Sequence, residues 1–362
     1  MKKILIPILS LIVFLTDSTA CTTFCLKDSK SLIYGRNYDF DFGSGFMVIN
    51  RKGLNKTAFI QPPAIPAKWT SKYGSITFNQ IGIDLPMEGM NEKGLVIAQM
   101  GLFESKFPNS DNKPCVGGLE WIQYQLDNSC TLDEVIENNK KISTIPDIIP
   151  VHYLICDSLG NVGIIEFING QVKVYKGKDI KYPVLSNDTY EKSMKDLKEY
   201  NGFGGQKPIP SKWDNISDII AKGSYLISNY DSKNTNLNII DYGFNILTEV
   251  ASPTRTQWSV IYDIINKKIV FKSLQNKELR TISMNDFDFS CSNNIRLLDI
   301  QKSTSQEKIE KQFFDFSLDY YRNYLKILNK TFEDNMPGFP KIPNDLFELQ
   351  VNYPLTRKCN EK

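Results

Sequence analysis

The sequence predicts an α+β protein built on antiparallel sheets, with its helices grouped apart from the strands. Pairs of apolar strands separated by short turn sequences recur along the 362 residues, and helical segments interrupt them without regular alternation. The chain also lacks the GxGxxG and phosphate-loop patterns of nucleotide-binding βαβ folds. Hydrophobic residues make up 41% and charged residues 23%, which is enough apolar material for a globular core.

The N-terminal segment has the layout of a secretory signal peptide. A positive start precedes an apolar run over residues 4–15, and Ser18 and Ala20 then occupy positions −3 and −1 before Cys21. We therefore expect residues 1–20 to be removed and the protein to be secreted or periplasmic. A retained membrane anchor is the alternative, although the run is too short to span a bilayer. No later segment is apolar enough for a membrane span.

The first half of the mature chain begins with two hairpins. "CTTFCLKDSKSLIYGRNYDF" alternates with Cys21 and Cys25 on one face and a turn at 28–30. "LPMEGMNEKGLVIAQMGL" is a second hairpin that turns at 91–94. Two helices follow: "GGLEWIQYQLDNS" has helical spacing of its apolar residues, and Thr131 with Glu134 forms a capping box that opens the next helix.

The second half continues with strands, then helices. "VHYLICDSLGNVGIIEFINGQVKVYKG" alternates around turns at 160–161 and 169–170, and "TQWSVIYDIINKKIVFKS" is a later hairpin. Helices are expected near 191–200 and over 216–228. A long helix over about 304–330 is expected from Thr304 and Glu307 as its opening residues, with an apolar face made of Ile309, Phe313, Phe316, Tyr320, Tyr324 and Ile327.

These elements predict one domain over residues 21–335. The segment 336–362 is interpreted as a Pro-rich, extended tail.

The charge balance and the single histidine exclude several classes of function. Loss of residues 1–20 leaves 41 basic and 40 acidic residues, a net charge of +1, which is too balanced for capture of nucleic acid. His152 is the one histidine and no CxxC pair is present, so the usual metal sites are excluded. A lone histidine in a strand is more often a core or edge residue than a catalytic base.

Seven cysteines are an odd number for an exported protein, which suggests that one thiol stays free. If Cys21 is that thiol, the other six could pair. The sequence does not assign their connectivity, and buried free thiols are an equally fair interpretation for Cys25 and Cys156. The six are Cys25, Cys115, Cys130, Cys156, Cys291 and Cys359.

A cysteine at a new N-terminus combines two reactive groups. Its thiolate is a nucleophile, and its α-amine, with a pKa of about 7.7–8.0, can accept the thiol proton. Two alternatives stay open for Cys21, namely a lipid anchor and an ordinary disulfide cysteine. Arg36 and Asp39 favour the nucleophile, because the short hairpin brings both opposite Cys21.

Together these motifs resemble the choloylglycine hydrolase and penicillin V acylase family, whose members are N-terminal-nucleophile hydrolases of linear amides. The resemblance covers residue 21 to roughly 273 and implies a four-layer αββα sandwich. It also implies hydrolysis of a small non-peptide acyl amide through a thioester, with no metal or organic cofactor; a homo-oligomer is left open. The alternative is a non-catalytic binding protein, lipid-anchored on Cys21. The matching segments are "GRNYDF", "GMNEKGLVIAQMGL", "LEWIQYQLDNSCTLDEVIENNKKI", "HYLICDSLGNVGIIEF", "PVLSNDTY" and "TQWSVIYD".

The resemblance assigns four catalytic roles. Cys21 supplies nucleophile and base, Arg36 holds the thiol, Asp39 orients the α-amine, and Asn187 donates its side-chain amide to the oxyanion. Without the resemblance, Asn187 reads as a turn residue.

Two further positions are implied less directly. Gly101, with Gln99 as the fallback, falls at the second oxyanion position and would act through its backbone N–H. The arginine expected in a helix of bile-salt members is replaced here by Asp218, and Arg255 is the candidate substitute for substrate binding. Because aromatic residues such as Phe40, Phe42 and Phe46 follow Asp39, we expect aryl- or fatty-acyl amides to be preferred over conjugated bile salts.

Overall fold

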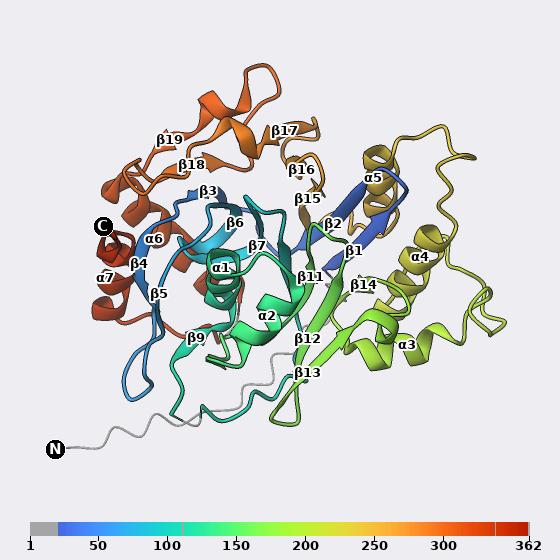
Figure 1. Ribbon diagram of the computed structural model, residues 1–362, viewed down its shortest axis with the longest axis horizontal. Coiled ribbons are helices and arrows are strands. Elements are labelled where there is room, and N and C mark those ends of the chain that lie inside the picture. The colour runs from blue at the N-terminus through green and yellow to red at the C-terminus, as the bar shows by residue number, and fades with distance from the viewer. Residues whose placement is uncertain (1–20, 111, 337, 361–362) are drawn as a thin grey trace.

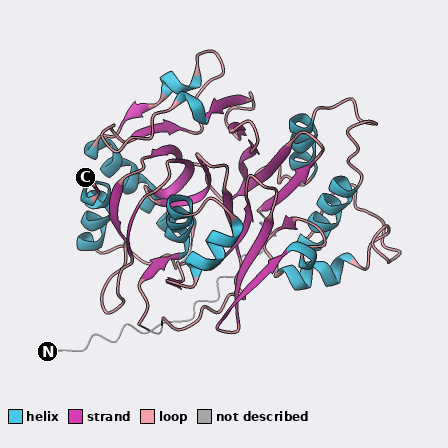
Figure 2. Ribbon diagram, in the orientation of Figure 1, coloured by secondary structure: helices cyan, strands magenta, loops and turns pink. Residues whose placement is uncertain are grey.

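The computed structural model describes residues 21–110, 112–336 and 338–360, so the predicted signal peptide lies outside the described residues. Two large antiparallel sheets pack face to face, and helices cover the outer side of each (Figures 1 and 2). This arrangement confirms the α+β sandwich. Within the described ranges, no helix has both the length and the hydropathy needed to cross a membrane.

The first sheet has six strands in the order β14-β1-β2-β15-β16-β17. It contains the predicted first hairpin and the predicted late hairpin as its central strands, which are paired to each other through β2 and β15. The strands are β1 Thr22–Lys27, β2 Leu32–Asp39, β14 Val184–Leu185, β15 Thr256–Asp263, β16 Lys268–Ser273 and β17 Arg280–Ser283.

The second sheet has nine strands in the order β13-β12-β11-β8-β7-β6-β3-β18-β19. These are β3 Phe46–Asn50, β6 Ser75–Gly82, β7 Leu85–Asn91, β8 Val96–Gly101, β11 Val151–Cys156, β12 Val162–Ile168, β13 Gln171–Lys176, β18 Arg296–Asp299 and β19 Phe314–Asp315. Two small sheets lie beside it, one of β9 Cys115–Gly117 with β10 Ser143–Ile145, the other of β4 Leu54–Thr57, β5 Lys68–Thr70 and β20 Lys358–Cys359.

Seven α-helices are present in the described part of the chain. α3, α4 and α5 pack on the first sheet, whereas α1, α2, α6 and α7 pack on the second. Helix α5 was not predicted. The bounds are α1 Gly118–Asn128, α2 Leu132–Asn139, α3 Tyr190–Leu197, α4 Ile216–Ser228, α5 Ile239–Glu249, α6 Leu318–Asn335 and α7 Asn344–Asn352, with short 3-10 helices at Gly177–Asp179, Met284–Asp286, Ile309–Gln312 and Tyr353–Thr356.

Strand alternation separates the central core from the outer cores. On β1, Cys25 faces the core between the sheets, as Cys21 does just before the strand, while Phe24 faces the helices. On β11, Leu154 faces the central core and Tyr153 packs under α1. This period of two is the pattern that the sequence predicted for the first hairpin.

Local turn and capping chemistry explains why the predicted elements begin where they do. Asp28 closes the first hairpin, because its Oδ1 accepts hydrogen bonds from the backbone N–H groups of Lys30 and Ser31, both at 2.8 Å. Thr131 caps α2 by accepting from the N–H of Glu134, whose carboxylate in turn accepts from the N–H of Cys130. The predicted hairpin and the Thr131 cap are therefore confirmed, and Glu134 returns its bond to the residue before the N-cap, not to Thr131 itself.

The expected long helix over 304–330 is wrong at its start. Residues 304–308 form a loop and residues 309–312 a 3-10 turn, and the Gln312 side chain closes this segment by hydrogen bonding both backbone groups of Thr304. Strand β19 follows. Helix α6 begins at Leu318, capped by Ser317. Its buried stripe is Tyr321, Leu325, Leu328 and Phe332. Ile327 and Tyr320, which were expected on the apolar face, are 57% and 38% exposed.

The C-terminal tail is also not extended as predicted. Pro343 stands at the N-cap of α7, where a proline does not interrupt helical hydrogen bonds. Strand β20 follows later and pairs with β4. Phe347 and Val351 of α7 are buried against the second sheet.

One disulfide joins Cys291 to Cys359 across 68 residues of chain. The other five cysteines are free thiols, so Cys115 and Cys130 are not bonded to each other. Cys25 and Cys156 belong to the central core and contact each other as thiols, which agrees with the buried-thiol interpretation.

Candidate active site

Cys21 lies directly before β1, with its thiol among backbone and side-chain groups of β2. The Asp39 N–H donates to Cys21 Sγ at 3.4 Å, and Sγ lies 3.6 Å from the Asp39 carbonyl oxygen. Arg36 Nη2 is 3.8 Å from Sγ. The antiparallel register, which sets Thr22 opposite Asn37 and Thr23 opposite Arg36, produces this convergence as predicted.

The Arg36 guanidinium is completely buried and fixed by three contacts. Besides Cys21, its Nε lies 3.4 Å from Glu88 Oε2 and its Nη1 lies 3.1 Å from Met100 Sδ. Trp258 Nε1 donates to the other Glu88 oxygen at 2.7 Å. Although burial lowers the pKa of Arg36, the neighbouring Cys21 and Glu88 more than offset it. Arg36 is therefore a permanent cation beside the thiol.

Burial raises the pKa of the Cys21 thiol, and the Arg36 charge only partly opposes this. The carboxylates of Asp39 and Glu88 raise the same pKa further. The resting thiol is thus protonated near neutral pH and needs a base within reach before it can attack.

The Asp39 carboxyl is buried, and its two oxygens differ. Oδ1 accepts a hydrogen bond from Thr256 Oγ1 at 2.5 Å, whereas Oδ2 has no hydrogen-bond partner among the described residues. Burial raises the pKa of Asp39 to about 7, against the lowering effects of Thr256, Arg36 and Arg255. A buried carboxyl with one unsatisfied oxygen is a strong acceptor for a nearby donor.

Asn187 and Gly101 are brought together as expected. Asn187 Nδ2 donates to the Gly101 carbonyl at 2.8 Å, which fixes the orientation of the amide. The preceding residue, Ser186, donates its hydroxyl to the Cys21 carbonyl at 2.7 Å, so this segment is in contact with the candidate nucleophile. Gln99, the alternative to Gly101, instead directs its amide at Met87 Sδ, 3.4 Å away.

Arg255 lies beside the site, in a different setting from the one expected for a substrate anchor. Its guanidinium is paired with Asp41 at 2.6 Å, and its carbonyl accepts from the Phe40 N–H at 2.9 Å. Asp218 is held by Tyr200 and Lys207 on the far side of the first sheet.

His152 is a core residue. Its Nδ1 lies 3.1 Å from Glu166 Oε1 and its Nε2 lies 2.6 Å from the Ser186 carbonyl, so both ring nitrogens are engaged. Its contact with the Ser186 carbonyl helps to hold that segment in place. In the described part of the chain, no three His, Cys, Asp or Glu side chains lie close enough to hold a metal ion.

Sequence reasoning missed three residues of this site, Glu88, Thr256 and Ser186. Each stands in a segment that was quoted for its strand pattern, next to or within the motifs that carried the resemblance. A buried arginine requires a compensating buried carboxylate. A glutamate within the apolar strand segment "PMEG" was therefore a signal for Glu88.

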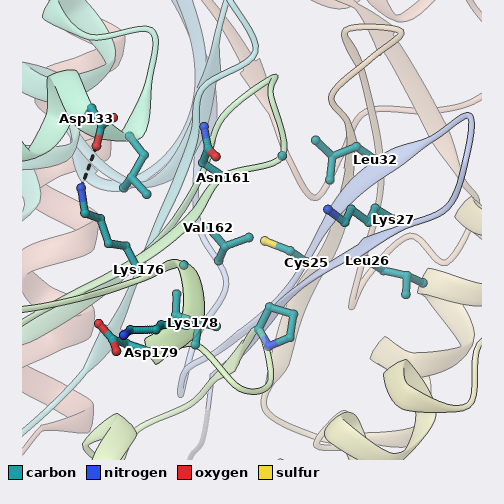
Figure 3. A pocket seen from close by; sticks show the side chains of 15 residues that line it. Cys25, Leu26, Lys27, Leu32, Asp133, Asn161, Val162, Lys176, Lys178 and Asp179 are labelled. Carbon is teal, nitrogen blue, oxygen red and sulfur yellow. Dashed lines mark hydrogen bonds and ion pairs between the residues drawn. The ribbon is translucent and has the colours of Figure 1, made fainter.

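A cavity of about 650 Å³ lies elsewhere, along β1 at Cys25 to Lys27 and facing the turn after β13 (Figure 3). None of the predicted site residues lines this cavity. Lys176 and Asp133, which do line it, form an exposed ion pair (Figure 3). A smaller hollow of about 150 Å³ borders Thr256, the residue that holds Asp39. Cys21 remains the candidate site, because Arg36, Asp39 and Ser186 contact it, whereas none of these residues lines the larger cavity.

Comparison with known proteins finds relatives and solved structures that share this fold. The chain is 23% identical over 263 residues to a penicillin V acylase from Pectobacterium atrosepticum, covering 62% of this chain and 69% of that protein. The structure of penicillin V acylase from Agrobacterium tumefaciens matches with a TM-score of 0.71 and 24% identity, covering 82% of this chain and 98% of that one. A mutant of conjugated bile acid hydrolase from Clostridium perfringens matches with a TM-score of 0.64 and 20% identity, covering 79% of this chain and 99% of that one.

The model of one family, described as linear amide C–N hydrolases of the choloylglycine hydrolase family, matches residues 21–297. That range begins at the candidate nucleophile and includes every residue of the site described above. The chain therefore belongs to the choloylglycine hydrolase family of linear amide C–N hydrolases.

Proposed function

We propose that this enzyme hydrolyses a linear, non-peptide acyl amide through a thioester on Cys21, once removal of residues 1–20 has made Cys21 the N-terminus. Membership of the family supports the amide hydrolysis. The contacts of Cys21 with Arg36 and Asp39 support the choice of nucleophile.

The observation that carries the proposal is the unpartnered Oδ2 of Asp39. Thr256 already satisfies Oδ1, so Oδ2 is the acceptor that remains for an α-amine at residue 21. A carboxylate in this position orients the amine toward its own thiol. It also stabilises the ammonium that forms when the amine takes the thiol proton.

The reaction then proceeds in two balanced stages. The α-amine takes the thiol proton while sulfur attacks the amide carbonyl, which gives a tetrahedral oxyanion. As the C–N bond breaks, the leaving amine takes that proton from the α-ammonium, and the acyl group remains as a thioester. Water then attacks the thioester, the α-amine accepts its proton, and sulfur departs with a proton as the carboxylic acid is released.

Asn187 is the proposed donor to the oxyanion. Its amide is fixed by the Gly101 carbonyl, which leaves the second hydrogen of Nδ2 for the intermediate. A preorganised donor of this kind contributes ~2.7–4 kcal/mol to the transition state.

Aryl- or fatty-acyl amides, such as a phenoxyacetyl amide, are the proposed substrates. Phe40 and Phe42 lie partly exposed in the loop after Asp39, where they offer apolar contact to an acyl group. Phe46, by contrast, is wholly buried under α6 and is not part of a pocket wall. The curated relative and one solved structure carry the name penicillin V acylase, which is consistent with this substrate class. Export remains a prediction of the N-terminal segment.

The first experiment compares Cys21→Ala with Cys25→Ala in the secreted, processed protein. Cys25 is a matched control, because it is a second buried thiol that faces the same central core from β1, the strand that Cys21 precedes. We expect Cys21→Ala to abolish turnover of a phenoxyacetyl amide and Cys25→Ala to retain it. N-terminal analysis should give a free amine on Cys21. A diacylglycerol-modified Cys21 without turnover would refute the mechanism and favour the lipid-anchored alternative. Full turnover by Cys21→Ala would refute Cys21 as the nucleophile.

A further inference from the structure

The C-terminal segment, residues 298–360, lies beyond the part of the chain that the family model matches. Three contacts fix its far end to the domain. The Cys291–Cys359 disulfide joins it to the loop before β18, β20 pairs with β4, and Arg357 forms a buried ion pair with Asp84 at 2.5 Å. The segment is therefore an integral part of the molecule.

Helix α6 of this segment packs on the second sheet, as α7 does (Figure 1). Its buried stripe packs on Phe46, Val48 and Leu297 from β3 and β18. The Tyr321 hydroxyl accepts a hydrogen bond from the Ile83 N–H at 3.1 Å. These contacts set the helix in a fixed position relative to β3, the strand that follows the loop after Asp39.

Near its C-terminal end, α6 presents Phe332 to that loop, residues 40–45, which we call the Asp39 loop. The Phe332 ring meets Phe42 edge to face at 4.8 Å and Phe40 at 6.0 Å. Phe339 stacks on Phe332 at 4.7 Å from within the C-terminal segment. Such aromatic pairs prefer defined angles, so Phe332 fixes the orientation of both loop rings as well as covering them.

Polar contacts from the same segment hold the loop backbone. Gln301 Nε2 donates to the Gly43 carbonyl at 2.8 Å. The Tyr324 hydroxyl donates to the carbonyl of Gln80 at 2.7 Å, and Gln80 Nε2 donates to the Phe42 carbonyl at 2.8 Å. A Cβ on Gly43 would come within 2.7 Å of Gln301 Nε2, which shows how closely the loop is enclosed.

The other end of the Asp39 loop is the candidate active site. Asp39 contacts Cys21 Sγ, the Phe40 N–H donates to the Arg255 carbonyl, and Asp41 pairs with Arg255. Six residues thus connect the nucleophile to a segment that the family model does not include. Asp39 itself is held by Thr256 in the sheet, so a change in the C-terminal segment would move the loop rings more than the catalytic carboxyl.

We propose that Phe332 is a specificity-determining residue, which acts through Phe40 and Phe42 to shape the wall that receives the acyl group. The proposal rests on the proposed function, because it takes Cys21 as the point of attack. It assigns the C-terminal segment a role in choosing between bulky and small acyl groups. Phe332 does not take part in the bond-making steps.

The test compares Phe332→Ala with Phe347→Ala, which is matched because Phe347 is buried in the same outer core and has no ring contact with the Asp39 loop among the described contacts. The substrates are the phenoxyacetyl and acetyl amides of one fluorogenic aromatic amine. We expect Phe332→Ala to lower kcat/KM for the phenoxyacetyl amide at least tenfold, mainly through KM, and to change the acetyl amide less than twofold. Phe347→Ala should leave the ratio unchanged.

Equal losses on both substrates, or an unchanged ratio, would overturn the proposal. If Phe332→Ala does not fold, Phe42→Ala takes its place and should shift the ratio in the same direction. Absence of turnover by the processed wild type would instead contradict the proposed function. In that case, Cys21 can be labelled with a small reagent, iodoacetamide, and with a bulky aromatic one, N-phenylmaleimide. The ratio of the two labelling rates, followed by peptide mass, then measures the selectivity between small and bulky groups. A rate ratio that Phe332→Ala leaves unchanged would still overturn the role of Phe332.

Discussion

At the residue scale, the site combines a buried thiol whose pKa is raised by burial with a cation and a carboxyl at fixed positions. Burial raises the pKa of Asp39 to about 7, although Thr256, Arg36 and Arg255 lower it, and its Oδ2 has no hydrogen-bond partner among the described residues. Arg36 also pairs with Glu88. We therefore expect activity to depend on the ionisation of Asp39.

Replacing Thr256 with valine should move the acidic limb of the kcat/KM profile to higher pH. The Thr256 hydroxyl lowers the pKa of Asp39 by donating to it, so its loss raises that pKa and reduces the ionised fraction at a given pH. One lost hydrogen bond to a carboxylate corresponds to a shift of about one pH unit. Ser259→Ala is the control, since this hydroxyl is on the same strand but binds Asn37. Profiles that coincide for Thr256→Val and wild type would contradict the role of Asp39.

Replacing Gly101 with alanine should lower kcat about 10–100-fold with little change in KM. The new Cβ would lie 3.1 Å from Asn187 Nδ2, so it displaces the amide that is proposed to stabilise the oxyanion. In a double-mutant cycle, Gly101→Ala should add little to the loss caused by Asn187→Ala, because both act on one group. Additive losses would show that Gly101 acts independently of Asn187.

At the scale of elements, the chain from residue 298 onward depends on tertiary anchors more than on its own propensities. Helix α7 has nine residues, which is too short for stability in isolation, and β20 has two. The disulfide and the burial of Phe347 and Val351 hold these elements in place. We therefore expect the disulfide to be important for stability.

The double replacement of Cys291 and Cys359 by serine should reduce the free energy of unfolding by about 2–4 kcal/mol, because the bond closes a long loop of 68 residues. Denaturant unfolding of the two proteins under non-reducing conditions measures this difference. Cys130→Ser, which alters a half-buried free thiol, is the control and should change stability little. Equal midpoints and slopes for the double variant and wild type would disprove the anchoring role.

At the scale of the whole molecule, a buried charge network joins the C-terminus to the second sheet and α1. Lys56 pairs with Asp84 at 3.3 Å and with Asp127 at 2.7 Å, and Arg357 pairs with Asp84. All four side chains are nearly inaccessible to solvent, so the two cations and two carboxylates compensate each other.

Arg357→Met should destabilise the fold by about 3–5 kcal/mol, because it leaves two buried carboxylates, Asp84 and Asp127, with Lys56 as the cation that they share. Arg322→Met is the matched control at the surface, where loss of the ion pair with Glu348 should change stability little. Thermal or denaturant unfolding measures both effects. A smaller loss for Arg357→Met than for Arg322→Met would mean that the network does not stabilise the molecule.

Stability should fall as pH rises from about 4 to about 7. Burial raises the pKa of Glu120 to about 7 and that of Asp147 to about 6, so the folded state binds more protons than the unfolded state in this window. Above about pH 7 the unfolding free energy should level off. Glu120→Gln should flatten the curve measured by denaturant unfolding at pH 5 and pH 7.5, on the order of 1–3 kcal/mol. A wild-type curve that rises over this range would contradict the assignment.

The sequence by itself determined several local structures and the proximity of Arg36 and Asp39 to Cys21. Asp28, the Thr131–Glu134 capping box and the period of two along β1 and β11 are local signals, and a short hairpin leaves Arg36 and Asp39 no other place than opposite Cys21. Asn187 and Gly101 came from the resemblance, and the structure brings these two together.

Only the tertiary structure decided which partners those residues have. Thr256 lies on β15, which pairs with β2 across a large sequence distance, and Ser186 follows β14, which pairs with β1 in the same way. Glu88 meets Arg36 from the opposite sheet. No local pattern states such long-range contacts. Tertiary contacts also decided residues 304–317. There the Arg296 side chain binds the Glu310 carbonyl and the Gln312 side chain binds the Thr304 carbonyl, and these contacts outweigh the helical pattern. The buried face of α6 was likewise predicted incorrectly. Local propensity is worth tenths of a kcal/mol per residue, whereas burial of one large side chain is worth about 1.5–3 kcal/mol, so tertiary packing prevails where the two disagree.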